Sequence, residues 1–220
     1  MTTAVHAEAR RNMVDNQLRA NTVTDQALLA AMGELPREGF LPGHLAGCAY
    51  FDDDVPLGRG RFLMEPMVMA RLIQAAGVGL GDRVLDIGCA TGYSTAVLAR
   101  LAKSVVAVES DPALARRARE TLQGLGVANA TVVDGPLEQG HQALAPYDVI
   151  VIGGAIERLP RAVADQLTHG GRLVAVLASR ARGRMGEASL YTGRPLTRVT
   201  LFDAATGLLP GFAAEPGFVF

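Results

Sequence analysis

A glycine-rich turn with an acidic residue on either side offers the clearest chemistry in this sequence. The stretch DIGCATGY begins at Asp86 and contains Gly88 and Gly92. A turn of this kind, leading from a strand into a helix, exposes backbone N–H groups at the helix N-terminus and commonly binds a nucleotide. Glu109 ends the next apolar run, 21 residues after Gly88, where a carboxylate can bind a ribose. For the glycines alone, the alternative is a tight turn that binds nothing.

The position of Asp86 indicates which kind of nucleotide would fit. A dinucleotide lays its pyrophosphate on the helix N-terminus, where a carboxylate at roughly 4 Å would repel it by about 1 to 4 kcal/mol. Ala90 also replaces a glycine that would let the backbone approach a pyrophosphate. S-adenosylmethionine has no phosphate and carries an ammonium and a sulfonium, so the same carboxylate would attract it. The turn therefore favours a cationic cofactor.

The elements that must position these residues alternate between strand and helix patterns, which predicts a mostly parallel sheet covered on both faces. Apolar runs predict strands over 83–87, 104–109, 130–134, 147–152 and 171–178. Helices are expected over 66–76, 93–102, 112–123 and 159–169, the third capped by Asp111.

The segments on either side of this core have different residue patterns. Helices are expected over 4–19 and 25–33, with Thr24 as the cap of the second and Gly33 as its stop, and a loop from 36 to 60. Alternating patterns at 187–193 and 196–202 predict antiparallel strands added at the sheet edge. We expect one domain over 1–220, made of a helical and loop extension (1–65), a doubly wound α/β core (66–178) and a β-rich C-terminal piece (179–220).

Composition excludes several classes of function. The chain is 49% hydrophobic with 21 basic and 22 acidic residues, so nothing attracts it generally to nucleic acid or to an anionic membrane. Its N-terminus lacks a signal-peptide pattern, no apolar run has the length of a membrane span, and two cysteines make no disulfide framework. The four histidines are scattered without ligand spacing, so no metal is expected. We expect a cytoplasmic protein.

The motif Asp-x-Gly-x-x-x-Gly, with an acidic residue ending the next strand, resembles the class I S-adenosylmethionine-dependent methyltransferases, which have a Rossmann-like fold. From about Arg10 to Leu177 the resemblance narrows to the protein-L-isoaspartate O-methyltransferase family. It is carried by the stretches RNMVDNQLRANTVTDQALLAAMGELPREGFLP, AYFDDDVPLGRGRFLMEP, RVLDIGCATGYSTAVLARL, APYDVIVIGGA and LPRAVADQLTHGGRLVAVL.

This resemblance implies methyl transfer from S-adenosyl-L-methionine to a carboxylate of a protein or peptide, with L-isoaspartyl residues of damaged proteins as the leading acceptor. The oligomeric state is left open. The residues expected at the cofactor are Asp86, Gly88, Cys89 and Ala90 beside its methionine part, Gly92 and Tyr93 at the helix start, Glu109 at the ribose, Asp134 and Gly135 at the adenine, and also Ser110.

The sequence departs from the family's Gly-Gln-Thr-Ile-Ser-Gln-Pro before the first core helix, where it reads GRFLMEP from Gly60 to Pro66. Met64 takes the place of a serine associated with substrate and cofactor placement, so no catalytic residue is assigned. The candidates for substrate binding are Arg61, Phe62, Leu63, Met64 and Glu65.

Alternatives stay open at this point. The apolar residues of GRFLMEP could form a reshaped acceptor pocket or only a hydrophobic anchor, and Arg61 could bind an acidic acceptor or be a solvated surface residue. The family's Gly-Asp-Gly is also changed, to Gly135-Pro136-Leu137. The chain could therefore methylate another small molecule or peptide, or be a non-catalytic cofactor-binding protein of the same fold.

Overall fold

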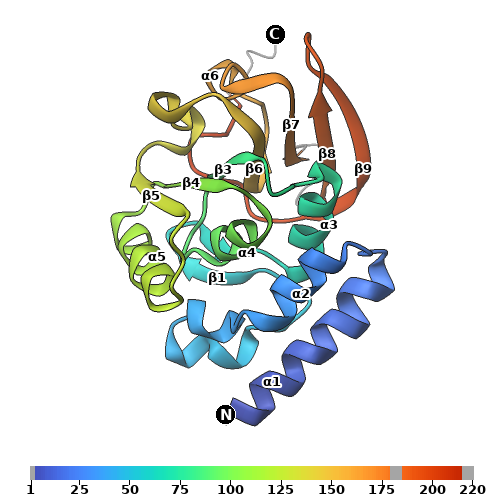
Figure 1. Ribbon diagram of the computed structural model, residues 1–220, viewed down its shortest axis with the longest axis vertical. Helices are drawn as coiled ribbons and strands as arrows, with labels where there is room; N and C mark the ends of the chain where they lie inside the picture. Colours follow the sequence, from blue (N-terminus) through green and yellow to red (C-terminus); the bar gives the residue numbers. More distant parts are fainter. Residues whose placement is uncertain (1–2, 179–184, 215–220) are drawn as a thin grey trace, which may run out of the picture.

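One seven-stranded sheet forms the centre of the molecule in the computed structural model, which describes residues 3–178 and 185–214 (Figure 1). Its first five strands in space are parallel and its last two are antiparallel, as the sequence predicts for a doubly wound core with an antiparallel addition. In spatial order the strands are β5 (Ala130–Asp134), β4 (Ser104–Glu109), β3 (Arg83–Ile87), β6 (Tyr147–Ile156), β7 (Leu167–Ala178), β8 (Met185–Thr192) and β9 (Thr197–Ala205).

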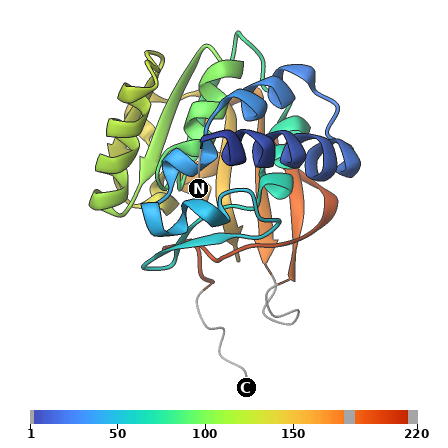
Figure 2. The same cartoon turned by 90° about the horizontal axis from the view of Figure 1, so that it is seen from below.

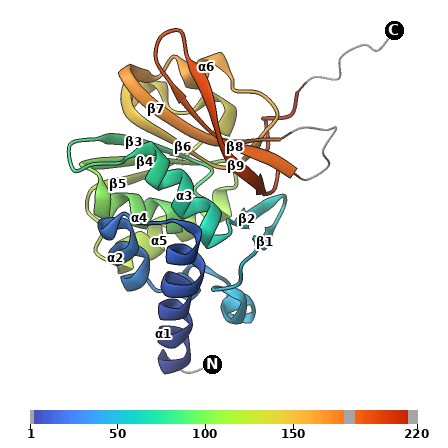
Figure 3. The same cartoon turned by 90° about the vertical axis from the view of Figure 1, so that its right-hand side faces the viewer.

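Helices cover both sides of this sheet unequally (Figure 3). One face carries the three long core helices, with the N-terminal helices stacked outside them, and the other carries short elements only. The core helices are α3 (Pro66–Ala76), α4 (Tyr93–Leu101) and α5 (Pro112–Gly124); the outer ones are α1 (Thr3–Asn12), the π-helix η1 (Met13–Leu18), η2 (Arg19–Asn21) and α2 (Gln26–Glu34). The short elements of the other face are η5 (Leu137–Gln139), η6 (Gln142–Leu144) and α6 (Arg161–Ala164).

Helix boundaries mostly follow the expected capping residues. Asp111 accepts from the N–H groups of the first turn of α5, and α3 begins at Pro66 and ends before a left-handed Gly77. Two expectations are wrong by one residue at α2: Asp25, not Thr24, caps the helix, and the helix continues past Gly33 to Glu34. Asp25 is the capping residue because its carboxylate accepts hydrogen bonds from two backbone N–H groups of the first turn.

The expected helix over 159–169 is wrong for most of its length, since α6 contains four residues. The cause is tertiary. Leu167 already pairs with Tyr147 in the sheet, and the Tyr147 N–H donates to the Gln166 carbonyl at 2.8 Å. The buried Gln166 side chain also donates to the carbonyl of Gln139 and accepts from the N–H of His141. This fixes the chain in a non-helical path.

The expected loop over 36–60 contains structure of its own. It holds the 3-10 helices η3 (Arg37–Phe40) and η4 (Gly43–Cys48), and it leads into a hairpin of β1 (Val55–Gly58) and β2 (Arg61–Leu63). In Figure 2 this hairpin and the segment that follows β9 lie side by side at the lower ends of the strands. Among the described residues, no helix has the length and apolar character needed to cross a membrane.

The segment after β9 returns across the carboxyl edge of the sheet. The Ala155 N–H donates to the Gly207 carbonyl at 2.8 Å, and the Leu209 N–H donates back to the Ala155 carbonyl at 2.9 Å. This pairing extends the end of β6 by a short parallel bridge and brings the C-terminal part of the chain against the turn after β3 (Figure 1).

Replacing Gly92 by alanine should destabilise the fold by roughly 1–3 kcal/mol, because the residue has φ of 93° and an added Cβ would lie 3.2 Å from the Cβ of Ala118. Urea unfolding measures the change. Gly124→Ala, in the last turn of α5 with open space around it, is the matched control and should stabilise by roughly 0.5–1 kcal/mol. Equal effects of the two substitutions would contradict this account of the turn.

Candidate active site

A small crevice opens at the carboxyl ends of β3 and β6, where the strand order reverses direction. This is the place where open α/β sheets bind their ligands. Its free volume is about 20 Å³. Its walls come from β2, from the turn after β3, from β6 and from α3, through Phe62, Leu63, Met64, Met69, Leu72, Gly88, Cys89, Ala90, Ser94, Val151, Ile152 and Gly153.

The turn after β3 has the tight geometry that its glycines allow. Gly88 and Gly92 have φ of 81° and 93°, and Ala90 has a positive φ of 51°. The N–H groups of Gly88 and Cys89 both point to the Val108 carbonyl of β4, at 2.8 and 3.3 Å. The turn is therefore bound to the neighbouring strand and leaves the Ala90 N–H directed at Glu109.

Asp86 lies at the end of β3 and is fully buried. Its Oδ2 accepts from the hydroxyls of Ser94 at 2.8 Å and Thr95 at 2.7 Å, both in the first turns of α4. Its Oδ1 has no hydrogen-bond partner among the described residues. Burial raises the pKa of Asp86 to about 6, although the two hydroxyls act against this rise. The carboxylate is thus ionised at neutral pH but incompletely compensated.

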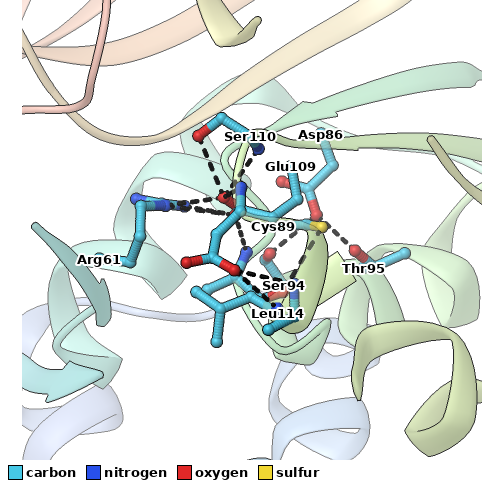
Figure 4. Close-up of polar contacts among 11 residues, drawn as sticks. Arg61, Asp86, Cys89, Ser94, Thr95, Glu109, Ser110 and Leu114 are labelled. Carbon is cyan, nitrogen blue, oxygen red and sulfur yellow. Dashed lines mark hydrogen bonds and ion pairs between the residues drawn. The ribbon is translucent and has the colours of Figure 1, made fainter. Parts of the chain in front are cut away.

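Glu109 and Arg61 form a fully buried ion pair against the turn after β3 (Figure 4). Arg61 Nη2 lies 2.7 Å from Oε2 of Glu109, and its Nε lies 3.0 Å from Oε1. The same carboxylate accepts backbone N–H groups from Ala90, Ser110 and Asp111. Burial alone would raise the pKa of Glu109. The hydrogen bonds and charge of Arg61, together with the hydrogen bonds from the backbone N–H groups, outweigh this effect and lower the pKa.

The expectation of a solvated surface position for Arg61 is wrong, because the residue is 2% exposed. The β1–β2 hairpin explains the difference. Gly58 and Gly60 have positive φ, as does Arg59 between them, so the chain reverses tightly. Strand β2 then directs Arg61 inward at Glu109, whereas the Arg59 side chain is 82% exposed.

Two apolar side chains, Phe62 and Leu209, pack closely against glycines beside the crevice. A Cβ added to Gly88 would meet Leu209 at 3.3 Å, and one added to Gly154 would meet Leu209 at 2.7 Å and Phe62 at 3.0 Å. A Cβ on Gly207 would meet Phe62 at 2.3 Å. Sequence reasoning missed Leu209 altogether. The sequence signal that could have indicated it is the set of glycines at 88, 154 and 207, which let Leu209 and Phe62 approach the backbone.

Asp54 holds the C-terminal segment in this position. Its Oδ2 accepts from the Thr206 hydroxyl at 2.7 Å and the Gly207 N–H at 3.1 Å, and its Oδ1 accepts from the Glu65 N–H at 2.9 Å. Asp54, in the acidic run at 52–54, therefore links the hairpin region to the segment after β9.

The segment that carries the substrate-binding candidates is mostly buried. Phe62, Leu63 and Met64 are 8%, 4% and 6% exposed, as expected for a hydrophobic anchor, and all three line the crevice. The Met64 carbonyl accepts from the buried guanidinium of Arg37, which also donates to the Ala49 carbonyl at 2.6 Å. The neighbouring carboxyl group of Glu65 is half-buried. Burial, followed by the charges of the acidic run, raises its pKa to about 7.

Other expected cofactor residues lie further from the crevice. The Tyr93 ring packs edge-on against Phe40, with ring centres 5.2 Å apart, and beneath the Arg37 guanidinium, so it belongs to the helical layer. Asp134 forms an exposed ion pair with Arg119 at the end of β5. The Gly135 N–H donates to the Glu109 carbonyl at 3.1 Å.

Cys89 is buried in the turn, and burial raises the pKa of its thiol well above the ordinary value, with the nearby carboxylates of Asp86 and Glu109 adding to the rise. A thiol buried in this way is unreactive. Within 3–178 and 185–214, no three His, Cys, Asp or Glu side chains cluster as metal ligands would.

Sequence comparison relates the chain to one family. The model of the family described as protein-L-isoaspartate(D-aspartate) O-methyltransferase matches residues 8–188. A protein-L-isoaspartate O-methyltransferase of Methanoculleus marisnigri is 43% identical over 171 residues, which are 78% of each chain. Protein-L-isoaspartate O-methyltransferase 2 of Anaeromyxobacter sp. is 41% identical over 165 residues, covering 75% of this chain and 68% of that protein.

Solved structures agree in fold. A protein-L-isoaspartate O-methyltransferase superposes with a TM-score of 0.79 at 26% identity over 92% of this chain, which spans 66% of that longer one. A putative enzyme of the same name from Plasmodium falciparum, solved with S-adenosyl-L-homocysteine, has a TM-score of 0.74 at 20% identity, covering 90% of this chain and 96% of that one. The latter likeness concerns the fold alone.

The wild type should lose stability as the pH rises from about 4 to about 7, and the Asp86→Asn variant should not show this loss. The folded-state pKa of Asp86, about 6, lies above its ordinary value of 3.8, so ionisation opposes folding over this window. A rise of about two pKa units corresponds to roughly 3 kcal/mol of unfolding free energy. Urea unfolding at several pH values measures it. The exposed Asp165→Asn on α6 is the control, and parallel curves for wild type and Asp86→Asn would refute the assignment.

Proposed function

The chain belongs to the protein-L-isoaspartate O-methyltransferase family, and we propose that it transfers a methyl group from S-adenosyl-L-methionine to the free carboxylate of L-isoaspartyl residues in proteins. The observation that carries this proposal is the family match over residues 8–188, which includes both the turn after β3 and the β1–β2 hairpin. The chain is accordingly an S-adenosylmethionine-dependent enzyme with a Rossmann-like core.

The crevice suits such a cofactor in its chemistry but not in its present volume. The buried carboxylates of Asp86 and Glu109 favour a cationic ligand, and the positive φ of Gly88 keeps the floor free of a side chain. When bound, S-adenosylmethionine supplies a methyl group on a sulfonium. Small-molecule sites commonly measure about 300–1,000 Å³. The 20 Å³ left here is too small for the cofactor, and we propose that Arg61 and Leu209, which both lie over Gly88, move before it enters.

The residues that we propose for the cofactor are unchanged from the sequence prediction. They are Asp86, Gly88, Cys89, Ala90, Gly92, Tyr93, Glu109, Ser110, Asp134 and Gly135. We propose a single domain over 1–220 and a cytoplasmic location, which the free thiols of Cys48 and Cys89 suit because disulfides are rare there.

The protein's contribution to the reaction is mainly one of positioning. An acceptor carboxylate with a pKa near 4 is ionised at neutral pH and needs no general base, so the chain has only to hold its oxygen in line with the methyl carbon. Phe62, Leu63 and Met64 line the crevice, and we propose that the acceptor approaches the methyl group along this segment, next to Glu65. The raised pKa of Glu65, about 7, lets this residue become neutral just below pH 7. Its repulsion of an acceptor carboxylate then falls.

The direct test is transfer of radiolabelled methyl groups to an isoaspartyl peptide, with the matching aspartyl peptide as control. The proposal expects base-labile label in the isoaspartyl peptide only. Label in neither peptide, from a protein that binds the cofactor, would mean that the chain methylates another acceptor or none.

Met64→Ser should raise kcat/KM for the isoaspartyl peptide about ten- to a hundredfold, since one hydroxyl bonded to a charged group contributes roughly 1.5–3 kcal/mol. Met64 lines the crevice at the position of the family's serine. Steady-state kinetics against Met67→Ser, a half-buried methionine on α3, separates this effect from a general loss of packing. No gain over wild type would remove the support for this position as an acceptor contact.

A further inference from the structure

We propose that Arg61 is an internal competitor of the cofactor: its guanidinium occupies the cationic place beside Glu109, and the cofactor enters only when the β1–β2 hairpin withdraws Arg61. This inference rests on the proposed function, because it names the event that must precede cofactor binding at the same site.

Glu109 has no free acceptor position while Arg61 is in place. Its Oε1 accepts from Arg61 Nε and from the N–H groups of Ser110 and Asp111, at 3.0, 2.8 and 3.1 Å. Its Oε2 accepts from Arg61 Nη2 and from the Ala90 N–H, both at 2.7 Å. A carboxylate offers about four lone-pair sites, so ribose hydroxyls can bind Glu109 only where they replace the guanidinium.

Arg61 also covers the turn that would receive the cofactor. Arg61 Nη2 would lie 3.1 Å from a Cβ placed on Gly88, so the guanidinium lies directly over the glycine turn. Leu209 lies over the same glycine at 3.3 Å. The remaining 20 Å³ is enough for about one water molecule. Figure 4 shows the guanidinium directed at Glu109, with Asp86, Ser94 and Thr95 grouped beside the pair.

Asp86 and Glu109 bring two buried carboxylates to the turn after β3, and Arg61 is a cation that lowers the pKa of both groups. The compensation is incomplete, because among the described residues Nη1 of Arg61 and Oδ1 of Asp86 are both buried without a hydrogen-bond partner. Such buried polar atoms carry an energetic penalty. A cationic ligand that binds Oδ1 of Asp86, while Arg61 moves out to water, would remove it.

The hairpin that carries Arg61 is built so that it can move apart from the sheet. Within the described part of the chain, strands β1 and β2 pair with each other and not with the seven-stranded sheet. The link between them is the Gly58-Arg59-Gly60 turn, all three residues with positive φ. Movement of β2 would withdraw Arg61 and Phe62 together, and Phe62 is the residue that contacts the segment of Leu209.

Calorimetric titration with S-adenosyl-L-homocysteine, and with S-adenosyl-L-methionine, tests the proposal on the intact chain. Arg61→Gln should bind either compound at least about tenfold more tightly. In the wild type only the open molecules can bind, so the apparent affinity is the intrinsic affinity multiplied by the open fraction. Arg59→Gln, in the same hairpin but with an exposed side chain, should bind as the wild type does. Leu209→Ala should give a smaller gain than Arg61→Gln.

A second measurement keeps the proposal testable if Arg61→Gln fails to fold. In the wild type, hydrogen–deuterium exchange of the β1–β2 amides should become faster on saturation with S-adenosyl-L-homocysteine, whereas amides of the turn after β3 should become slower. Unchanged or slower exchange in β1–β2 would overturn the inference.

The outcomes of the titration separate the two proposals. Equal, measurable affinity in wild type and Arg61→Gln overturns the competitor role and leaves the proposed function standing. No binding in the wild type, in Arg61→Gln or in Leu209→Ala overturns both, since relief of the occlusion then reveals no cofactor site.

Discussion

The buried charge of Glu109 is the constraint that determines how the residues around it are arranged. A carboxylate removed from water at the end of β4 must be surrounded by donors, and the turn after β3 and the start of α5 provide backbone N–H groups for this purpose. These groups do not supply a full counter-charge, and Arg61 does. Because removal of one partner from such a buried pair commonly costs 3–5 kcal/mol, the hairpin position, the glycine turn and the ends of the strands depend on one another.

Much of the core could be predicted from the sequence, because its determinants are local. The strand from Arg83 to Ile87 and the helix that Asp111 caps follow from apolar runs and from capping chemistry within a few residues. The shortness of α6 could not be predicted, since it depends on sheet pairing between Leu167 and Tyr147. Sequence reasoning also expected a positive charge at the end of the first core strand. It assigned that charge to a ligand, whereas the structure shows a side chain of the same chain.

Three residues of the GRFLMEP stretch that depart from the family pattern share one environment. Arg61, Phe62 and Met64 all belong to the segment that closes the crevice, and each contacts a part of the chain distant in sequence. Such pairings are invisible in a single sequence because neither partner shows a local pattern. Gly154 and Gly207 are the sequence signal that these pairings leave, because any side chain there would collide with Leu209 or Phe62.

The bond between Asp54 and Thr206 joins residues 152 positions apart and has a consequence for biosynthesis. While the chain leaves the ribosome, the parallel strands can assemble before residues 206–209 emerge, so the crevice exists for a time without its apolar cover. Contacts of such long sequence separation form late in folding because of the loop that they close. A nascent chain would therefore pass through a state that is more open to small molecules than the finished protein.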